Sequence, residues 1–337
     1  MKAVGIYTLA NDTVFDQLVA LLNSIEVNVS QDIPICVIPY NNQLEKVNQE
    51  INSRKNVALF ENRESMQRWD NFANEVWAVH PAAKQGRLSR NSWHRSPLLR
   101  KLCTFDGEFE KFVFYDADSL AMKPLTNLLD KLDSYDFVFD DWEHKKSREN
   151  TALNLSIIEK TGLYKEEDIH SKLHCSSFFA SKKGIFAPSE LESLKNLLIE
   201  EDEIQWVRKW WDDAFLFNYM TLRYNRPLFN LTLSPNGADR TGNCANADPF
   251  ANINNVLYNQ DGLKPIYRLH YMSYSSVDFA RLCQGEDINI RYRDEFLYYR
   301  FLKQPEKKPT RLKPPSLITK TNRLFNKTLK KIQISIS

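Results

Sequence analysis

The stretch EKFVFYDADSLAMKPL, residues 110–125, decides the fold and raises the question of what its two aspartates bind. Four apolar residues at 112–115 are followed at once by Asp116 and Asp118, which stand one residue apart. Carboxylates at positions i and i+2 of an extended chain share a face, and a turn just past the strand lets both reach one hard cation. The pattern predicts a central strand that ends in a site for Mn²⁺ or Mg²⁺.

An Asp-x-Asp motif is short and common, and its aspartates can instead cap the turn that follows the strand. A cation held by two carboxylates keeps open positions, and these suit the oxygens of a diphosphate. The chain has nine glycines, and none of them forms a GxGxxG or GxxxxGK[ST] phosphate loop. A nucleoside diphosphate bridged by a metal is consistent with this context.

Around this stretch, short apolar segments alternate with amphipathic ones. We expect strands at 3–9, 34–40, 57–60, 112–115, 135–139, 175–180 and 266–271. We expect helices at 15–25, 44–52, 97–105, 188–199 and 206–222. The alternation predicts a Rossmann-like α/β fold, with a mixed, mainly parallel sheet flanked by helices and ligands at the carboxyl ends of its strands.

The composition changes near residue 303, which divides the chain into a domain at 1–302 and a tail at 303–337. The tail begins as a Pro/Lys-rich linker and carries ten lysines or arginines against one acid, Glu306. Apolar residues between 317 and 332 share one face of a helix if the tail is helical. Two interpretations stay open: a solvated basic tail, or a peripheral contact with an anionic membrane or a partner.

The charge and cysteine content limit the classes of function and location. Basic residues number 45 and acidic residues 43, which gives no general case for nucleic-acid binding. The five cysteines form no CxxC pair, as expected in a reducing compartment. No run of ~20 apolar residues is present. We therefore expect a cytoplasmic protein, and a peripheral contact with the inner face of a membrane is one of the two interpretations of its tail.

Five short blocks follow one another within residues 3–275: YTLAND (7–12), RKL (100–102) leading to FVFYDAD (112–118), HCSSFFA (174–180), DDAFLFN (212–218) and YRLH (267–270). Their order resembles glycosyltransferase family 8, the family of glycogenin and the bacterial lipopolysaccharide galactosyl- and glucosyltransferases. The resemblance implies a single domain of the glycosyltransferase A type. It also implies transfer of a hexose, with retained configuration, from a nucleoside-diphosphate sugar, expected to be a UDP-sugar.

The resemblance gives roles to particular residues. It implies that His270 joins the two aspartates as the third metal ligand, and that the acceptor is a hydroxyl of a saccharide, a lipid or another molecule. The residues expected to bind the donor are Tyr7, Thr8, Asn11, Arg100, Lys101, Asp116, Ala117, Asp118 and Ser176. Those expected to act on the transferred sugar are Asp212 and Asp213.

The chain departs from the family in one block that concerns the diphosphate. The family's His-x-x-Gly followed by Lys-Pro-Trp is here HYMSYS, residues 270–275, without a lysine. The phosphate charge then has to be met by the metal, by hydroxyls such as Ser273 or Ser275, or by basic residues such as Arg95. Replaced motifs of this kind also leave open a protein that binds a nucleotide sugar without turning it over.

A second enzyme class shares an apolar strand that ends in Asp-x-Asp. In phosphatases of the haloacid-dehalogenase type the first aspartate is the nucleophile, and residues 140–141 resemble their later acidic pair. Only 22 residues separate Asp118 from Asp140, which leaves no room for the intervening elements of that fold. Two polar regions remain without a firm role: Asp140-Asp141-Trp142, which suits either an acceptor sugar or a solvated loop, and residues 236–248, polar enough for a saccharide cleft.

Overall fold

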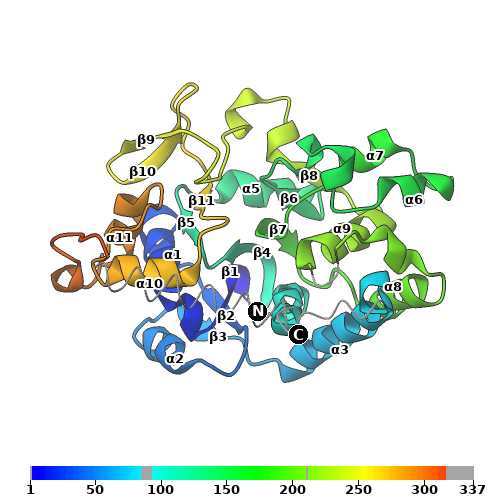
Figure 1. Ribbon diagram of the computed structural model, residues 1–337, viewed down its shortest axis with the longest axis horizontal. Coiled ribbons are helices and arrows are strands. Elements are labelled where there is room, and N and C mark those ends of the chain that lie inside the picture. Colours follow the sequence, from blue (N-terminus) through cyan, green and yellow to red (C-terminus); the bar gives the residue numbers. More distant parts are fainter. Residues whose placement is uncertain (1, 85–92, 210–211, 316–337) are drawn as a thin grey trace.

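The computed structural model describes residues 2–84, 93–209 and 212–315. At its centre is a seven-stranded sheet with the strand order β3-β2-β1-β4-β7-β6-β8 (Figure 1). Neighbouring strands are parallel except on either side of β7. The predicted mixed, mainly parallel sheet is thus confirmed. Its strands are β1 (Lys2–Ala10), β2 (Ile35–Pro39), β3 (Val57–Leu59), β4 (Phe109–Asp116), β6 (Phe137–Phe139), β7 (Phe178–Lys182) and β8 (Leu228–Asn230).

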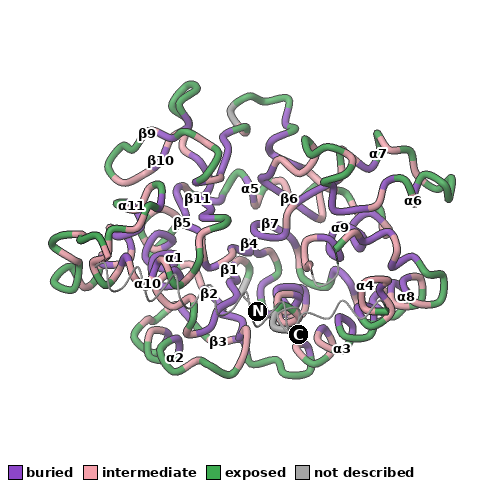
Figure 2. Tube along the Cα trace, in the orientation of Figure 1, coloured by how far each residue is buried: buried purple, intermediate pink, exposed green. Residues whose placement is uncertain are grey.

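Helices cover both faces of this sheet, because successive strand residues point to opposite sides. On β4, Phe112 and Phe114 pack with α3, α8 and α9, whereas Val113 and Tyr115 pack with α1, α2 and α5. The buried strands therefore form the middle layer of three (Figure 2). The helices are α1 (Phe15–Asn28), α2 (Glu45–Asn52), α3 (Arg63–Val79), α4 (Pro81–Lys84), α5 (Thr126–Asp130), α6 (Leu155–Lys160), α7 (Glu166–His170), α8 (Pro188–Ile199), α9 (Asp213–Arg223), α10 (Ser276–Cys283) and α11 (Arg293–Arg300).

A smaller lobe beside α1 is built from two antiparallel ribbons and the last two helices (Figure 1). One ribbon is the hairpin of β9 (Phe250–Ile253) and β10 (Val256–Asn259); the other pairs β5 (Ser119–Ala121) with β11 (Arg268–His270). In the second ribbon His270 lies opposite Ser119. The pairing brings His270 next to the Asp-x-Asp turn, although some 150 residues separate them along the chain.

Two of the predicted helices differ from the observed ones. Residues 93–106 form a 3₁₀ helix that contains Pro97, which has no backbone N–H to donate. The helix expected at 206–222 is replaced by a 3₁₀ turn, Glu203–Trp206, and by α9. The side chain of Asp212 accepts a hydrogen bond from Ala214 N (3.2 Å) and so fixes the start of α9.

The first part of the predicted tail lies on the smaller lobe. Lys313 N donates to Gly285 O (2.9 Å), Asp287 N donates to Lys313 O (2.8 Å), and Leu312 packs against the lobe's apolar cluster. Residues up to 313 are therefore held against the domain and do not form a free linker, although the boundary at 302 stays a prediction. The helix expected at 317–332 lies outside the described residues. No helix within the described ranges has the length and apolar content needed to span a membrane.

Candidate functional site

The carboxyl end of β4 presents Asp116 and Asp118 at one edge of the sheet. Asp116 N donates to Ser177 O (2.9 Å), and Tyr271 N donates to Asp118 O (2.9 Å), so backbone hydrogen bonds fix the turn on both sides. One ligand atom each from Asp116, Asp118 and His270 lie within 4.8 Å of one another. The three residues predicted as metal ligands are thus brought together by the fold.

The cluster has the composition of a divalent-cation site. Two carboxylate oxygens and one imidazole nitrogen form a donor set that Mn²⁺ accepts. Ligands of one cation with ~2.1 Å bonds lie at most ~4.2 Å apart, and His270 Nε2 lies 3.4 Å from Asp118 Oδ1. Both aspartate side chains are about a quarter exposed and the His270 side chain is 10% exposed. A cation could therefore reach the cluster and still keep positions open toward solvent.

Lys101 lies between this cluster and the first residue of α9 and contacts an aspartate of each. Its side chain is 2% exposed, and Nζ lies 3.1 Å from Asp116 Oδ1 and 2.6 Å from Asp213 Oδ2. Nζ also donates to the carbonyl and hydroxyl oxygens of Ser176, both at 3.3 Å, and Ser176 Oγ donates to Asp213 Oδ2 at 2.5 Å. Three predicted residues, Lys101, Ser176 and Asp213, therefore form one hydrogen-bonded group with the metal cluster.

The charges of the site are set by burial and by these ion pairs. Burial raises the pKa of Asp116, and the Lys101 ammonium offsets only part of this. Burial acts in the same sense on Asp118 and Asp213, but His270 outweighs it at Asp118 and Lys101 outweighs it at Asp213, so both pKa values are lowered. Burial alone would lower the pKa of Lys101, yet the two neighbouring carboxylates raise it. Lys101 thus contacts two carboxylates, and the third, Asp118, lies 3.4 Å from His270 Nε2; an excess of carboxylates over ammonium groups suits a dication.

A cavity of about 500 Å³ opens beside Asp116 and Asp118 at the carboxyl ends of β1, β2 and β4. Among the residues predicted to bind the donor, Asn11, Asp116, Ala117 and Asp118 line it. The other lining residues are Leu9, Ala10, Thr13, Val14, Gln17, Tyr40, Asn41, Leu98, Tyr274 and Ser276. We call it the donor cavity. Its size and its mixture of apolar and polar groups are typical of small-molecule sites.

Two residues expected to contact the nucleoside do not line the donor cavity. The Tyr7 ring is fully buried among aromatic side chains, and its hydroxyl accepts a hydrogen bond from Glu108 N (2.9 Å), at the amino end of β4. Thr8 is also fully buried, in the middle of β1. The cavity begins one residue later, at Leu9. The contact of Tyr7 and Thr8 with the nucleoside stays a prediction, and neither side chain lines this cavity.

Arg100 supports the wall of the donor cavity and does not line it. Its guanidinium binds the Asp70 carboxylate, with Nη2 2.6 Å from Oδ2, and Nη1 donates to the carbonyls of Pro39 (3.1 Å) and Tyr40 (3.3 Å). These bonds hold the segment after β2, which contributes Tyr40 and Asn41 to the cavity. The expected contact between Arg100 and the donor stays a prediction; in this structure Arg100 holds the segment that forms the cavity wall.

The two adjacent aspartates before and at the start of α9 have different surroundings. Asp213 is the one that binds Lys101 and Ser176, and its side chain is 12% exposed. Asp212 caps the helix, and burial, aided by Asp213, raises its pKa. Of the two residues predicted to act on the sugar, only Asp213 is directly bonded to the group around the metal cluster.

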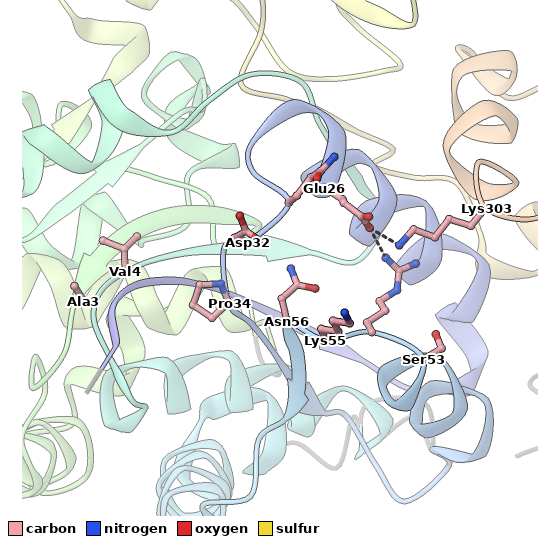
Figure 3. Close-up of a pocket in the computed structure, with 11 residues that line it drawn as sticks. Ala3, Val4, Glu26, Asp32, Pro34, Ser53, Lys55, Asn56 and Lys303 are labelled. Carbon is pink, nitrogen blue, oxygen red and sulfur yellow. Dashed lines mark hydrogen bonds and ion pairs between the residues drawn. The ribbon is translucent and has the colours of Figure 1, made fainter.

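A larger cavity, of about 890 Å³, lies at the opposite edge of the sheet (Figure 3). Ala3, Pro34 and Asn56, at the amino ends of the parallel strands, line it. Its Glu26 carboxylate pairs with Arg54 (3.3 Å) and with Lys303 (2.6 Å), as the dashed lines in Figure 3 show. Because these charges neutralise one another far from the Asp-x-Asp turn, we place the functional site at the smaller donor cavity.

Several lining residues were missed by reasoning from the sequence. Tyr40 and Asn41 directly follow β2, and the rule that ligands gather at the carboxyl ends of parallel strands could have identified them. Tyr274 and Ser276 come from the segment after β11, where no sequence pattern marks a nucleoside contact. Their position depends on the pairing of β11 with β5, which is a tertiary contact.

The chain matches no family model and no curated protein sequence. Among solved structures, the apo bifunctional glycosyltransferase WbbM aligns with a TM-score of 0.54 and 16% identity, over 91% of this chain and 52% of WbbM. Mouse xyloside xylosyltransferase 1 aligns with a TM-score of 0.47 and 9% identity, over 68% of this chain and 84% of its own. The galactosyltransferase LgtC, in complex with donor and acceptor sugar analogues, aligns with a TM-score of 0.43 and 11% identity, over 86% of this chain and 99% of LgtC.

The alignment with WbbM shows the fold of this chain. The mixed sheet flanked by helices is that of the glycosyltransferase A type, as predicted. The chain spans about half the length of WbbM. At this level of identity the likeness concerns the fold alone.

Proposed function

We propose that this protein is a glycosyltransferase that moves a hexose from a nucleoside-diphosphate sugar, a UDP-sugar in the first instance, to a hydroxyl acceptor with retained configuration. The observation that carries the proposal is the cluster of Asp116, Asp118 and His270 at the mouth of the donor cavity. An acidic metal cluster beside a cavity of this size, on a glycosyltransferase A-type fold, suits a ligand that joins a nucleoside to a diphosphate. We further propose membership of glycosyltransferase family 8, on the order of the motifs.

In this proposal the nucleoside occupies the donor cavity. Asn11 and Asn41 supply amide groups for the base and ribose, and Tyr40 supplies an aromatic ring at the cavity wall. Arg95 is exposed and would meet part of the phosphate charge. Arg100 keeps the wall in place through Asp70.

Asp116, Asp118 and His270 would hold Mn²⁺ or Mg²⁺, which stabilises negative charge on the departing nucleoside diphosphate. Lys101 keeps its proton and holds the carboxylates of Asp116 and Asp213 at a fixed separation. Lys101 lowers the pKa of Asp213, and the ionised carboxylate would accept hydrogen bonds from hydroxyls of the transferred sugar. Ser176 orients that carboxylate through its short hydrogen bond.

The phosphatase alternative fits these contacts poorly. It would need the residues at 140–141 to act as the later acidic pair. Asp140 is 0% exposed and Asp141 is 5% exposed, and the Asp141 carboxylate accepts hydrogen bonds from the backbone of Cys175 (2.8 Å) and Glu143 (3.0 Å). A pair enclosed in this way supports the ends of β6 and β7 better than it binds a phosphate ester or an ion.

We also propose that the protein acts in the cytoplasm on a saccharide, lipid or other hydroxyl acceptor. The basic residues of 303–337 would attract the chain to the inner face of a membrane that carries acceptor molecules. This last proposal rests on the charge of the sequence alone.

The test is release of nucleoside diphosphate from UDP-glucose, UDP-galactose, UDP-N-acetylglucosamine and GDP-mannose, with Mn²⁺ or with EDTA. We expect metal-dependent release from at least one UDP-sugar, and a loss of at least ~100-fold in Asp118→Ala, since several kcal/mol of charge stabilisation depend on the metal. Asp133→Asn, an exposed acid at the far end of the domain, is the matched control and should match the parent.

Three results would contradict the proposal. Release that is unchanged in Asp118→Ala would remove the metal cluster from the mechanism. Metal-dependent hydrolysis of p-nitrophenyl phosphate, without release from any nucleotide sugar, would favour the phosphatase. Tight binding of UDP without release in the presence of acceptors would favour the inactive binding protein.

A further inference from the structure

A second polar cavity, of about 560 Å³, lies beside Trp142. Its walls come from the segment that follows β6, from part of the segment 237–249, and from the turn after β10. We call it the Trp142 cavity. Its lining residues that matter here are Trp142, Arg240, Gly242, Asp248, Gln260 and Asp261.

The Trp142 cavity lies toward the same edge of the sheet as the metal cluster. β4 and β6 each run antiparallel to β7, so their carboxyl ends leave the sheet on the same side. Asp141, next to Trp142, accepts a hydrogen bond from Cys175 N (2.8 Å), and the next residue, Ser176, donates to Asp213 (2.5 Å). Two hydrogen bonds, through neighbouring residues of the chain, therefore connect the segment that carries Trp142 to Asp213, the carboxylate proposed to act on the sugar.

The opposite wall of the cavity is tied to the metal ligand His270. Asn243 O accepts a hydrogen bond from His270 N (2.7 Å), and Asn243 Nδ2 donates to Asp140 O (2.5 Å). The backbone N–H groups of Asn243 and Cys244 both donate to Asp248 Oδ2 at 2.9 Å. This wall is therefore a fixed part of the site and not a loose loop.

Gly242 shows that the wall is closely built. It has a φ of +79°, and a Cβ atom there would lie 2.8 Å from Asp248 Oδ2. Glycine is the residue that tolerates both the left-handed backbone and the close carboxylate.

The groups that line the cavity suit the surface of a sugar. Trp142 is partly buried and lines the cavity, and Lys145 Nζ lies 3.9 Å from the centroid of its ring. The C–H groups of a pyranose ring pack on the face of such a ring, as on any aromatic surface. The side chains of Arg240, Gln260 and Asp261 are exposed, and among the described residues none has a hydrogen-bond or ion-pair partner in the structure.

We propose that the Trp142 cavity binds one ring of a neutral oligosaccharide acceptor, at a distance from the ring that receives the hexose. The inference rests on the proposed function and adds a class of acceptor to it. Arg240 next to Asp248 and Asp261 offers both signs of charge, which matches hydroxyl groups that donate and accept. Lys264 also lines the cavity, so its two basic and two acidic side chains balance, and a neutral ligand fits this lining better than an anionic nucleotide or phospholipid headgroup does.

The test measures oligosaccharide binding apart from catalysis. Maltotetraose, lacto-N-tetraose and chitotetraose are added at about 5 mM, in the range of weak affinities, to the full chain in EDTA without nucleotide, and binding is followed by saturation-transfer NMR. We expect one of them to bind, with about 10-fold weaker binding in Trp142→Ala and near-parental binding in Trp142→Phe, because phenylalanine keeps an aromatic face.

Gln260→Ala and Asp261→Asn provide a second line of evidence, since both residues are exposed and their replacement leaves the core intact. Weaker binding in either variant, with an unchanged melting temperature, supports the assignment. Failure of all three oligosaccharides to bind the parent, or equal binding by Trp142→Ala, overturns the inference. Release of nucleoside diphosphate by the parent is measured in parallel, so a failure here is distinguished from a failure of the proposed function.

Discussion

Replacing Lys101 with methionine is expected to destabilise the metal-free protein by about 3–5 kcal/mol at neutral pH, the range for breaking a buried ion pair. The estimate follows from the surroundings of Nζ. The Lys101 side chain is 2% exposed and is shared between Asp116 (3.1 Å) and Asp213 (2.6 Å), whose side chains are also partly buried. Methionine fills a similar volume, so the main loss is the charge that the two carboxylates need.

The matched control is Lys111→Met. Lys111 also pairs with an aspartate, with Nζ 2.5 Å from Asp133 Oδ1, but the side chain of Asp133 is 73% exposed. Exposed pairs contribute at most about 1 kcal/mol, so this variant should lose little stability. The contrast between the two lysines separates burial from ion pairing as such.

The assay is urea unfolding in EDTA of the parent, Lys101→Met, Asp213→Asn and the double variant. Asp213→Asn removes one of the two stranded charges, so the double variant should be more stable than the sum of the single losses predicts, by about 1–3 kcal/mol. A loss below about 1 kcal/mol in Lys101→Met, or additive losses in the double variant, would refute the claim that this ammonium holds the site together.

Three further predictions concern stability and the donor cavity. Gly5→Ala should cost about 1–3 kcal/mol, because its Cβ would lie 2.4 Å from the buried Phe109 ring, and an unchanged melting temperature would contradict this. Burial lowers the pKa of His174 from 6.5 to about 3, so the stability that its neutral ring contributes is present above pH 6.5 and is lost as the pH falls toward 3. Between pH 7.5 and 5 the parent should therefore lose about 2 kcal/mol more than His174→Gln in urea unfolding, and equal losses would count against the buried neutral ring. Arg100→Lys keeps the charge but not the paired hydrogen bonds to Asp70, and should weaken UDP binding in calorimetry by about 10-fold, whereas unchanged affinity would remove its positioning role.

Much of the fold could be predicted from the sequence because its central strands are short, wholly apolar runs. The segment 112–115 is buried on both faces, and the predicted helix at 188–199 has the observed bounds of α8. Of the helix expected at 206–222, the part from Asp213 onward is observed as α9. Trp206 instead ends the 3₁₀ turn Glu203–Trp206, and the cap at Asp212 shows where the helix begins.

Site residues that belong to a local sequence motif could be predicted, whereas those whose position depends on tertiary packing could not. Asp116 and Asp118 follow directly from the end of an apolar strand. The sequence alone does not show the burial of Tyr7, because it depends on the packing of β1 against Phe112 in the core. Arg100 could not be separated from Lys101 by sequence alone, since only the fold shows that Asp70 lies beside one and Asp213 beside the other.

The most direct test of the central claim is calorimetric titration of the protein with UDP, GDP and CMP, with and without Mn²⁺, repeated on Asp118→Ala. If Asp116, Asp118 and His270 bind a cation that carries the diphosphate, UDP will bind only with Mn²⁺ and the variant will not bind it. Equal binding of UDP without Mn²⁺ or to the variant, or no binding of any of the three nucleotides, would contradict the assignment of this cluster as the donor site.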